Sequence, residues 1–77
     1  MEYEIREVDG ASVVVLQGDI DLETSSQSRK VLLECIEKRS PVLVDMSGVT
    51  YIDSSGIASL VEALQKSRQN KCLFALV

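Results

Sequence analysis

The sequence contains no histidine and no tryptophan, and its aromatic residues are two tyrosines and one phenylalanine. Without histidine, a Ser-His-Asp triad, a Cys-His pair and any histidine-ligated metal are excluded within this chain. With so few aromatic side chains, a base-stacking surface for nucleic acid is not expected. Basic residues number 8 against 12 acidic ones, and the resulting net charge of -4 disfavours binding to phosphate backbones. We therefore expect no direct binding of nucleic acid.

The sequence also lacks a hydrophobic run long enough to cross a bilayer. Its longest apolar runs, residues 13–16 and 72–77, fall well short of the ~20 residues that a spanning helix needs. The N-terminus is acidic and has no signal-peptide pattern. Cys35 and Cys72 are not in a CxxC spacing, so they are expected to be buried free thiols in a reducing compartment. These features predict a cytoplasmic location and no membrane insertion.

A chain of 77 residues has room for one small domain, which buries only about 60% of its unfolded surface. Its apolar pattern predicts the element order β-β-α-β-α-β. A first strand over residues 3–8 is expected to turn at Asp9 and Gly10, because that dipeptide suits a hairpin with positive φ at both central positions. The second strand, residues 12–17, is β-branched and is predicted to lie inside the sheet, covered on both faces.

Helices that join strands favour parallel pairing, so an α/β fold is expected in which an antiparallel hairpin precedes parallel strands. Residues 18–21 should end the second strand, and a helix is predicted over residues 22–38 with Asp21 as its N-cap. A third strand over residues 42–44 is also expected to be covered on both faces. The polar residues that follow predict a loop over 45–52.

A second helix is predicted over residues 54–68. Its core-facing stripe should consist of apolar residues at helical spacing, namely Ile57, Leu60, Val61 and Leu64. Glu62 and Lys66 are predicted to pair on the outer face. The last strand, residues 72–77, is strongly apolar and is expected to lie centrally, which would leave one face of the sheet under-covered. Either a second copy of the chain or a continuation of the domain is expected to cover that face.

The polar start of the second helix is the segment that could carry function. Asp53, Ser54, Ser55 and Gly56 follow the carboxyl end of a strand, where ligands bind in open α/β sheets. One interpretation is capping, in which Asp53 or Ser54 accepts backbone N–H groups and Gly56 lets the helix approach the sheet. The other is a modifiable serine, because a phosphate adds about -1.5 to -2 charges that a docked partner would have to desolvate.

Catalytic interpretations have less support. Asp45 and Asp53 could form a carboxylate pair, but no feature of the sequence places them across a cleft. Ser54 lacks a histidine base and a Gly-x-Ser-x-Gly elbow. Asp19 and Asp21 could coordinate Mg²⁺, although a helix cap and a solvated charge are expected more often around a turn. The sequence therefore predicts a protein that is not an enzyme and has no cofactor and no metal site.

Residues 18–21 read Gly-Asp-Ile-Asp before a helix, and residues 45–57 read Asp-x-Ser-x-Val-x-x-Ile-Asp-Ser-Ser-Gly-Ile. These two stretches resemble the STAS domain, in particular the bacterial anti-sigma-factor antagonists. The resemblance covers nearly the whole chain and implies the mixed sheet described above. Members of this family usually continue through a further helix. Residues 1–77 are therefore predicted to be a single STAS-like domain truncated at its C-terminal end, and a homodimer or a swapped dimer is one expected consequence.

The resemblance also implies a mechanism. In such antagonists, the unphosphorylated protein binds an anti-sigma factor with serine kinase activity and thereby releases a sigma factor. The kinase phosphorylates the serine directly after the motif's aspartate, and a protein phosphatase resets it. That serine is Ser54 here, with Ser55 as the alternative. The implied partner-binding surface comprises Asp19, Asp21, Asp53, Ser54, Ser55, Gly56, Ile57 and Ala58.

A second function from a different class remains open. STAS domains also form the cytoplasmic part of sulfate-type anion transporters and a small subunit of lipid-transport ATPase complexes. There, the same helix start would dock on a transporter without being phosphorylated. The intact Ser54 and the lack of a membrane segment favour the antagonist. A nucleotide-binding domain would need a phosphate-binding motif, which the sequence does not contain.

Overall fold

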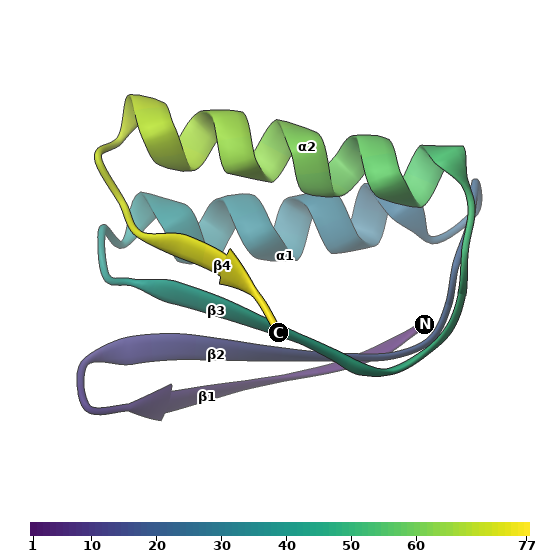
Figure 1. Ribbon diagram of the computed structural model, residues 1–77, viewed down its shortest axis with the longest axis horizontal. Coiled ribbons are helices and arrows are strands. Elements are labelled where there is room, and N and C mark those ends of the chain that lie inside the picture. Colours follow the sequence, from purple (N-terminus) through teal and green to yellow (C-terminus); the bar gives the residue numbers. More distant parts are fainter.

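The chain forms one four-stranded sheet with both helices on the same face (Figure 1). The computed structural model describes residues 1–77. The elements are β1 (Glu2–Val8), β2 (Ala11–Ile20), α1 (Ser25–Glu37), β3 (Val42–Ile52), α2 (Ser54–Gln69) and β4 (Phe74–Leu76). The strands lie side by side in the order β1-β2-β3-β4, with β1 antiparallel to β2 and the other pairs parallel. The predicted α/β class, element order and strand directions are confirmed.

The β1–β2 hairpin follows from its turn dipeptide. Asp9 has a φ of 52° and Gly10 a φ of 81°, which are the left-handed angles that a two-residue hairpin turn requires. Val8 and Ala11 form the last pair of the ladder. β1 is exposed along its whole length and lies at the edge of the sheet.

The core lies between the helices and one face of the sheet. Residues that pair across the parallel strands, such as Val14 and Val44, point to the same side and are fully buried there. Buried apolar residues of α1 and α2 close this layer. The complete core cluster consists of Val14, Leu16, Ile20, Val31, Leu32, Cys35, Ile36, Val42, Val44, Leu60 and Ala63.

The prediction that β2 and β3 are covered on both faces is wrong. Val13 and Val15 are half-buried, and Leu43 is 39% exposed, because they point away from the helices. The strands advance across the sheet in one direction, β2 to β3 to β4, and right-handed crossovers that advance in one direction place both helices on one face. β-branched residues suit a half-exposed strand as well as a buried one, so their run did not distinguish the two cases.

Both central strands are longer than predicted. β2 continues to Ile20 across a register shift next to Gly18, whose φ of 84° is accessible to glycine without strain. β3 runs on to Ile52 through polar residues that pair with the end of β2. The expected break at residues 18–21 and the expected loop at 45–52 are therefore both wrong, since strand pairing overrides the local turn and loop signals.

Helix α1 begins three residues later than predicted and ends one residue earlier. Asp21 nevertheless caps the turn that leads into α1, because the amide of Thr24 donates to its carboxylate at 3.2 Å. In return, the amide of Asp21 donates to the Thr24 hydroxyl at 2.9 Å. This reciprocal pair is the arrangement of a capping box. The regular helix starts at Ser25, with Thr24 at its N-cap position.

Helix α2 buries a different face from the one predicted. Its buried residues are mostly small ones, namely Gly56, Ser59, Leu60, Ala63 and Ser67. Of the expected apolar stripe, only Leu60 is buried, whereas Ile57 is 51% and Val61 46% exposed. Small side chains let α2 lie close to α1 and to the sheet. The apolar stripe therefore points to the side, away from α1.

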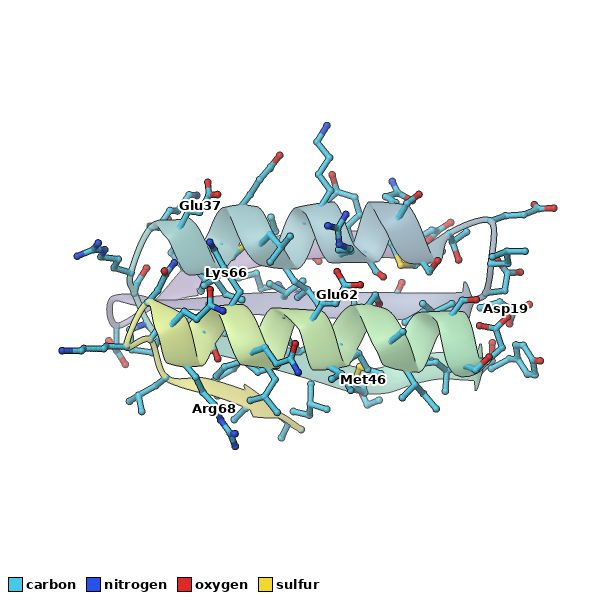
Figure 2. The ribbon with its side chains drawn as sticks, turned by 90° about the horizontal axis from the view of Figure 1, so that it is seen from above. Asp19, Glu37, Met46, Glu62, Lys66 and Arg68 are labelled. Atoms are coloured by element: carbon cyan, nitrogen blue, oxygen red, sulfur yellow. The ribbon has the colours of Figure 1, made fainter.

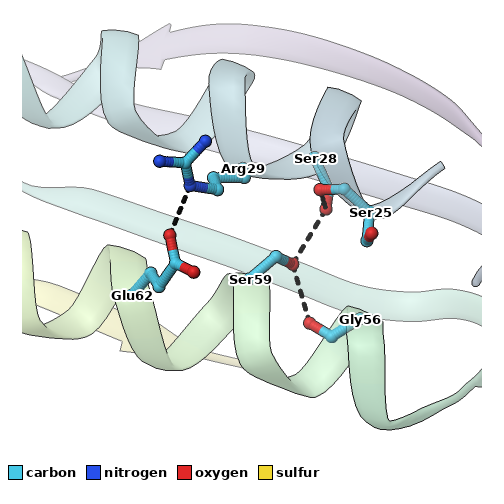
Figure 3. A network of polar contacts seen from close by, with 6 residues as sticks. All are labelled: Ser25, Ser28, Arg29, Gly56, Ser59 and Glu62. Carbon is cyan, nitrogen blue, oxygen red and sulfur yellow. Dashed lines mark hydrogen bonds and ion pairs between the residues drawn. The ribbon is translucent and has the colours of Figure 1, made fainter. Parts of the chain in front are cut away.

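Polar contacts between the helices explain why small and charged residues face α1 (Figure 3). The hydroxyls of Ser28 and Ser59 lie 2.9 Å apart in the buried layer, and Ser59 also donates to the carbonyl of Gly56 at 2.7 Å. Glu62 pairs with Arg29 of α1. The predicted pair between Glu62 and Lys66 within α2 is therefore wrong, because the neighbouring helix supplies the closer cation.

Strand β4 is a short edge strand rather than the expected central one. It spans Phe74–Leu76 and pairs with β3 alone, while the prediction extended it over residues 72–77. Neither helix of the structure has the length and apolar character needed to span a membrane.

The two cysteines differ in burial, which predicts different reactivity. Both are free thiols; Cys35 is 1% exposed, whereas Cys72 is half-buried at the start of the last segment. Burial raises the pKa of the Cys35 thiol, so its reactive thiolate is both scarce and inaccessible. With Ellman's reagent at pH 8, we expect one thiol of the folded protein to react quickly. This fast reaction should be absent from the Cys72→Ser variant. A fast phase that survives in Cys72→Ser would contradict this assignment.

Candidate functional site

The carboxyl ends of β2 and β3 lie next to each other and bring two loops together. Ile20 pairs with Ile52 at the last step of the parallel ladder. One residue later, the amide of Asp53 donates to the carbonyl of Ile20 at 3.2 Å. This bond joins the segment before α1 to the first turn of α2. The site predicted from the sequence is therefore formed by two neighbouring strand ends.

Gly56 sets how closely α2 approaches this corner. A Cβ atom at position 56 would lie 2.7 Å from the carbonyl oxygen of Ile20 and 2.6 Å from the Cγ1 atom of Ile52. No larger side chain fits without moving the helix. The capping interpretation, in which glycine permits close approach, therefore describes this position. Gly56 is buried and acts in packing.

The start of α2 leaves a serine hydroxyl accessible. The carboxylate of Asp53 accepts the amide of Gly56 at 3.0 Å, so Asp53 is the N-cap. Ser54 is exposed at the first helical position, and the side-chain bonds at this corner do not use its hydroxyl. Ser55 is half-buried and lines a shallow groove between α1 and α2. Ala58 is exposed one turn later.

Asp19 near the end of β2 and Asp21 just after this strand hold the corner together. The hydroxyl of Thr50 on β3 donates to the exposed carboxylate of Asp19 at 2.9 Å. Figure 2 shows Asp19 at the same end of the molecule as the start of α2. Asp21 is half-buried and accepts amides of its own turn. Both residues lie at the predicted site, and each also has a structural role.

Exposed apolar side chains that the sequence did not single out flank this serine. Leu22 is 76% exposed and lines the groove beside Ser55. Tyr51 is 56% exposed at the end of β3. Ile57, which the sequence placed in both the partner surface and the core stripe, is exposed one turn after Ser54. Leu22 was expected inside a helix and Tyr51 in a loop, so no pattern signalled their exposure at one corner.

Asp45 lies away from this corner and does not pair with Asp53. It pairs with Val15 in the middle of the sheet, on the face without helices. The hydroxyl and amide of Ser47 donate to its carboxylate at 2.7 and 2.9 Å. These bonds, together with the Arg6 guanidinium, hold the pKa of Asp45 below its usual range. No group of three or more histidine, cysteine, aspartate or glutamate side chains is arranged to hold a metal ion.

Comparison with known proteins identifies this architecture. The family model of the STAS domain matches residues 2–77, and the chain belongs to this family. An anti-sigma factor antagonist from Mycobacterium paratuberculosis superposes with a TM-score of 0.87 at 24% identity, over 97% of this chain and 64% of that one. The unphosphorylated form of the anti-sigma factor antagonist SpoIIAA gives a TM-score of 0.78 at 16% identity, over 97% of this chain and 71% of that one.

The same fold occurs in a transport protein. The murine anion transporter Slc26a9 superposes with a TM-score of 0.76 at 23% identity, over 92% of this chain and 12% of the transporter. At these identities the likenesses establish the fold. The chain spans 64% of the mycobacterial antagonist's length and a small part of the transporter's.

The contact at Gly56 predicts a clear effect on stability. Gly56→Ala places a methyl group against a backbone carbonyl, which should lower the free energy of unfolding by about 1–3 kcal/mol. The gain in helix propensity offsets part of this loss. Ser54→Ala, two residues away at an exposed position, should change stability by less than about 0.5 kcal/mol. Urea unfolding followed by circular dichroism measures both variants, and a Gly56→Ala protein as stable as Ser54→Ala would contradict the packing argument.

Proposed function

We propose that this protein is an anti-sigma factor antagonist whose binding is switched by phosphorylation of Ser54. In this proposal, the unmodified protein binds an anti-sigma factor that has serine kinase activity, and the phosphorylated protein releases it. A protein phosphatase restores the unmodified form. The observation that carries the proposal is the exposed, unbonded hydroxyl of Ser54 at the first position of α2. The likeness to antagonists, one of them known in unphosphorylated and phosphorylated forms, supports it.

The position of Ser54 suits a reversible modification. The carboxylate of Asp53 already accepts the amide of Gly56, so the amides of Ser54 and Ser55 are left to face an added phosphate. The partial positive charge of the helix start partly offsets the new negative charge. Asp53 opposes it. The fold should therefore tolerate the phosphate, while the surface that a partner meets changes strongly.

The surroundings of Ser54 make that change costly for a bound partner. Exposed Leu22, Tyr51 and Ile57 supply apolar surface at this corner, and a partner that packs on them must remove water from Ser54 as well. Desolvating a phosphate dianion is far more expensive than desolvating a hydroxyl. A penalty of about 3 kcal/mol already weakens binding roughly 100-fold. Modification can therefore control binding while the protein itself catalyses nothing.

The alternative function is that of a STAS component in a membrane transport assembly. The likeness to an anion transporter favours it. In that role, the same corner would dock on a transporter and would not need a phosphorylated serine. Phosphorylation by a dedicated kinase therefore separates the two functions.

The proposal predicts modification at one residue. When the protein is incubated with ATP and the anti-sigma kinases of its host, mass spectrometry should place one phosphate on Ser54. Ser55 is the alternative site, and its partial burial makes it the poorer acceptor. Failure of every such kinase to modify either serine would overturn the proposed switch and leave the transport role.

Binding of the kinase should respond to charge at this position. Ser54→Ala should bind the kinase about as well as the unmodified protein, and Ser54→Asp should bind at least about tenfold more weakly. Gln69→Asp adds the same charge at the exposed far end of α2 and is the matched control. Calorimetry measures all three variants. Equal affinities for Ser54→Asp and Gln69→Asp would contradict a local effect.

A further inference from the structure

The groove between α1 and α2, which Ser55 lines, contains a single cation. This α1–α2 groove has a volume of about 320 Å³, and four of the eight residues that line it are serines. Arg29 of α1 is the only basic residue among them, and Glu62 of α2 is the only acidic one. Figure 2 shows the two helices side by side, with β4 on the far side of α2. The groove is therefore formed by the paired helices and the turn before α1, without β4.

Arg29 uses one of the five N–H donors of its guanidinium. The Nε–H group donates to the carboxylate of Glu62, and the four N–H groups of the two terminal nitrogens have no side-chain acceptor. The side chains of Arg29 and Glu62 are 52% and 50% exposed. An ion pair this exposed is only weakly stabilising. Arg29 can therefore leave Glu62 for an acceptor that carries more charge.

Ser54 and Ser55 are adjacent in the chain but have different surroundings. Consecutive residues of an α-helix point about 100° apart. Ser55 lines the α1–α2 groove and faces α1, whereas Ser54 is exposed outside it. The side-chain bonds of this turn use Asp53 and Ser59 and leave the hydroxyl of Ser55 free. A phosphate on Ser55 would therefore enter the groove that contains Arg29.

We infer that a phosphate on Ser55 is bound inside the protein, by Arg29 in the α1–α2 groove. A serine kinase transfers the γ-phosphoryl group of ATP to the Ser55 oxygen, ADP leaves, and the hydroxyl proton passes to a base of the kinase. The guanidinium of Arg29 then exchanges the carboxylate of Glu62 for the phosphate. It donates two parallel N–H bonds to phosphate oxygens, a geometry that is stronger than its single bond to Glu62.

The position of Arg29 along the helix pair suits this exchange. The hydroxyls of Ser28 and Ser59 lie 2.9 Å apart, so Arg29 lies near the level of Ser59. Ser55 precedes Ser59 by one turn, a distance of about 6 Å along the helix axis. In Figure 3, the side chain of Arg29 extends toward Glu62, away from the starts of both helices. To bind the phosphate it turns back toward Ser55, which is the direction in which helical side chains lean.

The other charges around Ser55 are negative. Asp53 precedes the two serines, and Asp21 and Glu23 lie in the turn before α1. Each of these carboxylates repels a phosphate dianion, as does Glu62 within the groove. Arg29 is therefore the one side chain of the groove that can stabilise the dianion, and its removal should change the protonation of the phosphate.

Phosphates on the two serines then differ in their effect on a docked partner. A phosphate on Ser54 lies on the exposed corner, where a partner has to desolvate it. A phosphate on Ser55 lies between the helices, with its charge partly neutralised by Arg29. Modification of Ser55 therefore leaves most of the partner-binding surface unchanged. This consequence rests on the proposed function, whereas the pairing of Arg29 with the phosphate does not.

Phosphorus NMR tests the pairing without a partner. A pH titration of the full chain with phosphoserine at position 55 gives the second pKa of the phosphate. Arg29→Gln should raise this pKa by about 0.5–1, which is a three- to tenfold change in proton affinity, because the guanidinium favours the dianion. Lys30→Gln is the matched control, since it removes the same charge from the next, exposed position outside the groove. It should change the pKa by less than ~0.2 because solvent screens that charge.

The same titration with phosphoserine at position 54 establishes that the effect is local. There, Arg29→Gln should leave the pKa of the phosphate nearly unchanged. No rise for phosphoserine 55 in Arg29→Gln, an equal rise in Lys30→Gln, or an equal rise for the two phosphoserines would overturn the pairing. Circular dichroism establishes that each variant is folded. Because the titration needs no kinase, its failure and the failure of the proposed switch are distinguishable.

Calorimetry with the anti-sigma kinase tests the consequence for binding. The protein with phosphoserine at position 55 should bind at least about fivefold more tightly than the protein with phosphoserine at position 54. Arg29→Gln should remove most of this difference, because the phosphate at position 55 then lacks its cation. Equal affinities of the two phosphoproteins would overturn the different roles of the two serines.

Discussion

The contact between the start of α2 and the end of β2 organises this molecule. The carbonyl of Ile20 accepts the amide of Asp53 and lies where a Cβ atom of residue 56 would stand. Only glycine at position 56 lets the helix sit this low on the strand ends. The bond and the contact together place the cap at Asp53, and the cap in turn leaves Ser54 at the first, exposed position of the helix. The accessible hydroxyl is thus a consequence of packing two residues away.

A second constraint is that both crossovers run in the same direction. It places α1 and α2 on one face, side by side, and the small residues of α2 fill the space between them. Ser59 bonds to Ser28 and to the carbonyl of Gly56, so the helix pairing also supports the turn that carries Ser54. As a result, the larger apolar residues of α2, such as Val61 and Leu64, point away from α1 and line a groove beside β4.

The elements whose patterns are local could be predicted from the sequence. The Asp9-Gly10 turn, the order of elements, the span of α2 and the presence of a polar cap at Asp53 or Ser54 all depend on neighbouring residues. The site motif was recognisable for the same reason, because Asp53 and Ser54 are adjacent in the chain. These features need no knowledge of how distant segments pack.

Features that depend on tertiary pairing could not be predicted. The extension of β3 to Ile52 requires the register of β2, and no local pattern favours a strand through Gly48. The burial of the small face of α2 requires α1 beside it, whereas hydrophobic periodicity alone favoured Ile57 and Val61. Likewise, the exposure of Leu22 and Tyr51 next to Ser54 follows from two loops meeting at neighbouring strand ends.

The most direct test of the functional account is to measure binding with the real modification. Protein carrying phosphoserine at position 54 and unmodified protein can each be titrated into the anti-sigma kinase by calorimetry. The account predicts a folded phosphoprotein, with an unchanged far-ultraviolet spectrum, that binds at least about tenfold more weakly than the unmodified form. A phosphoprotein that binds equally well would contradict the role of Ser54 as a switch.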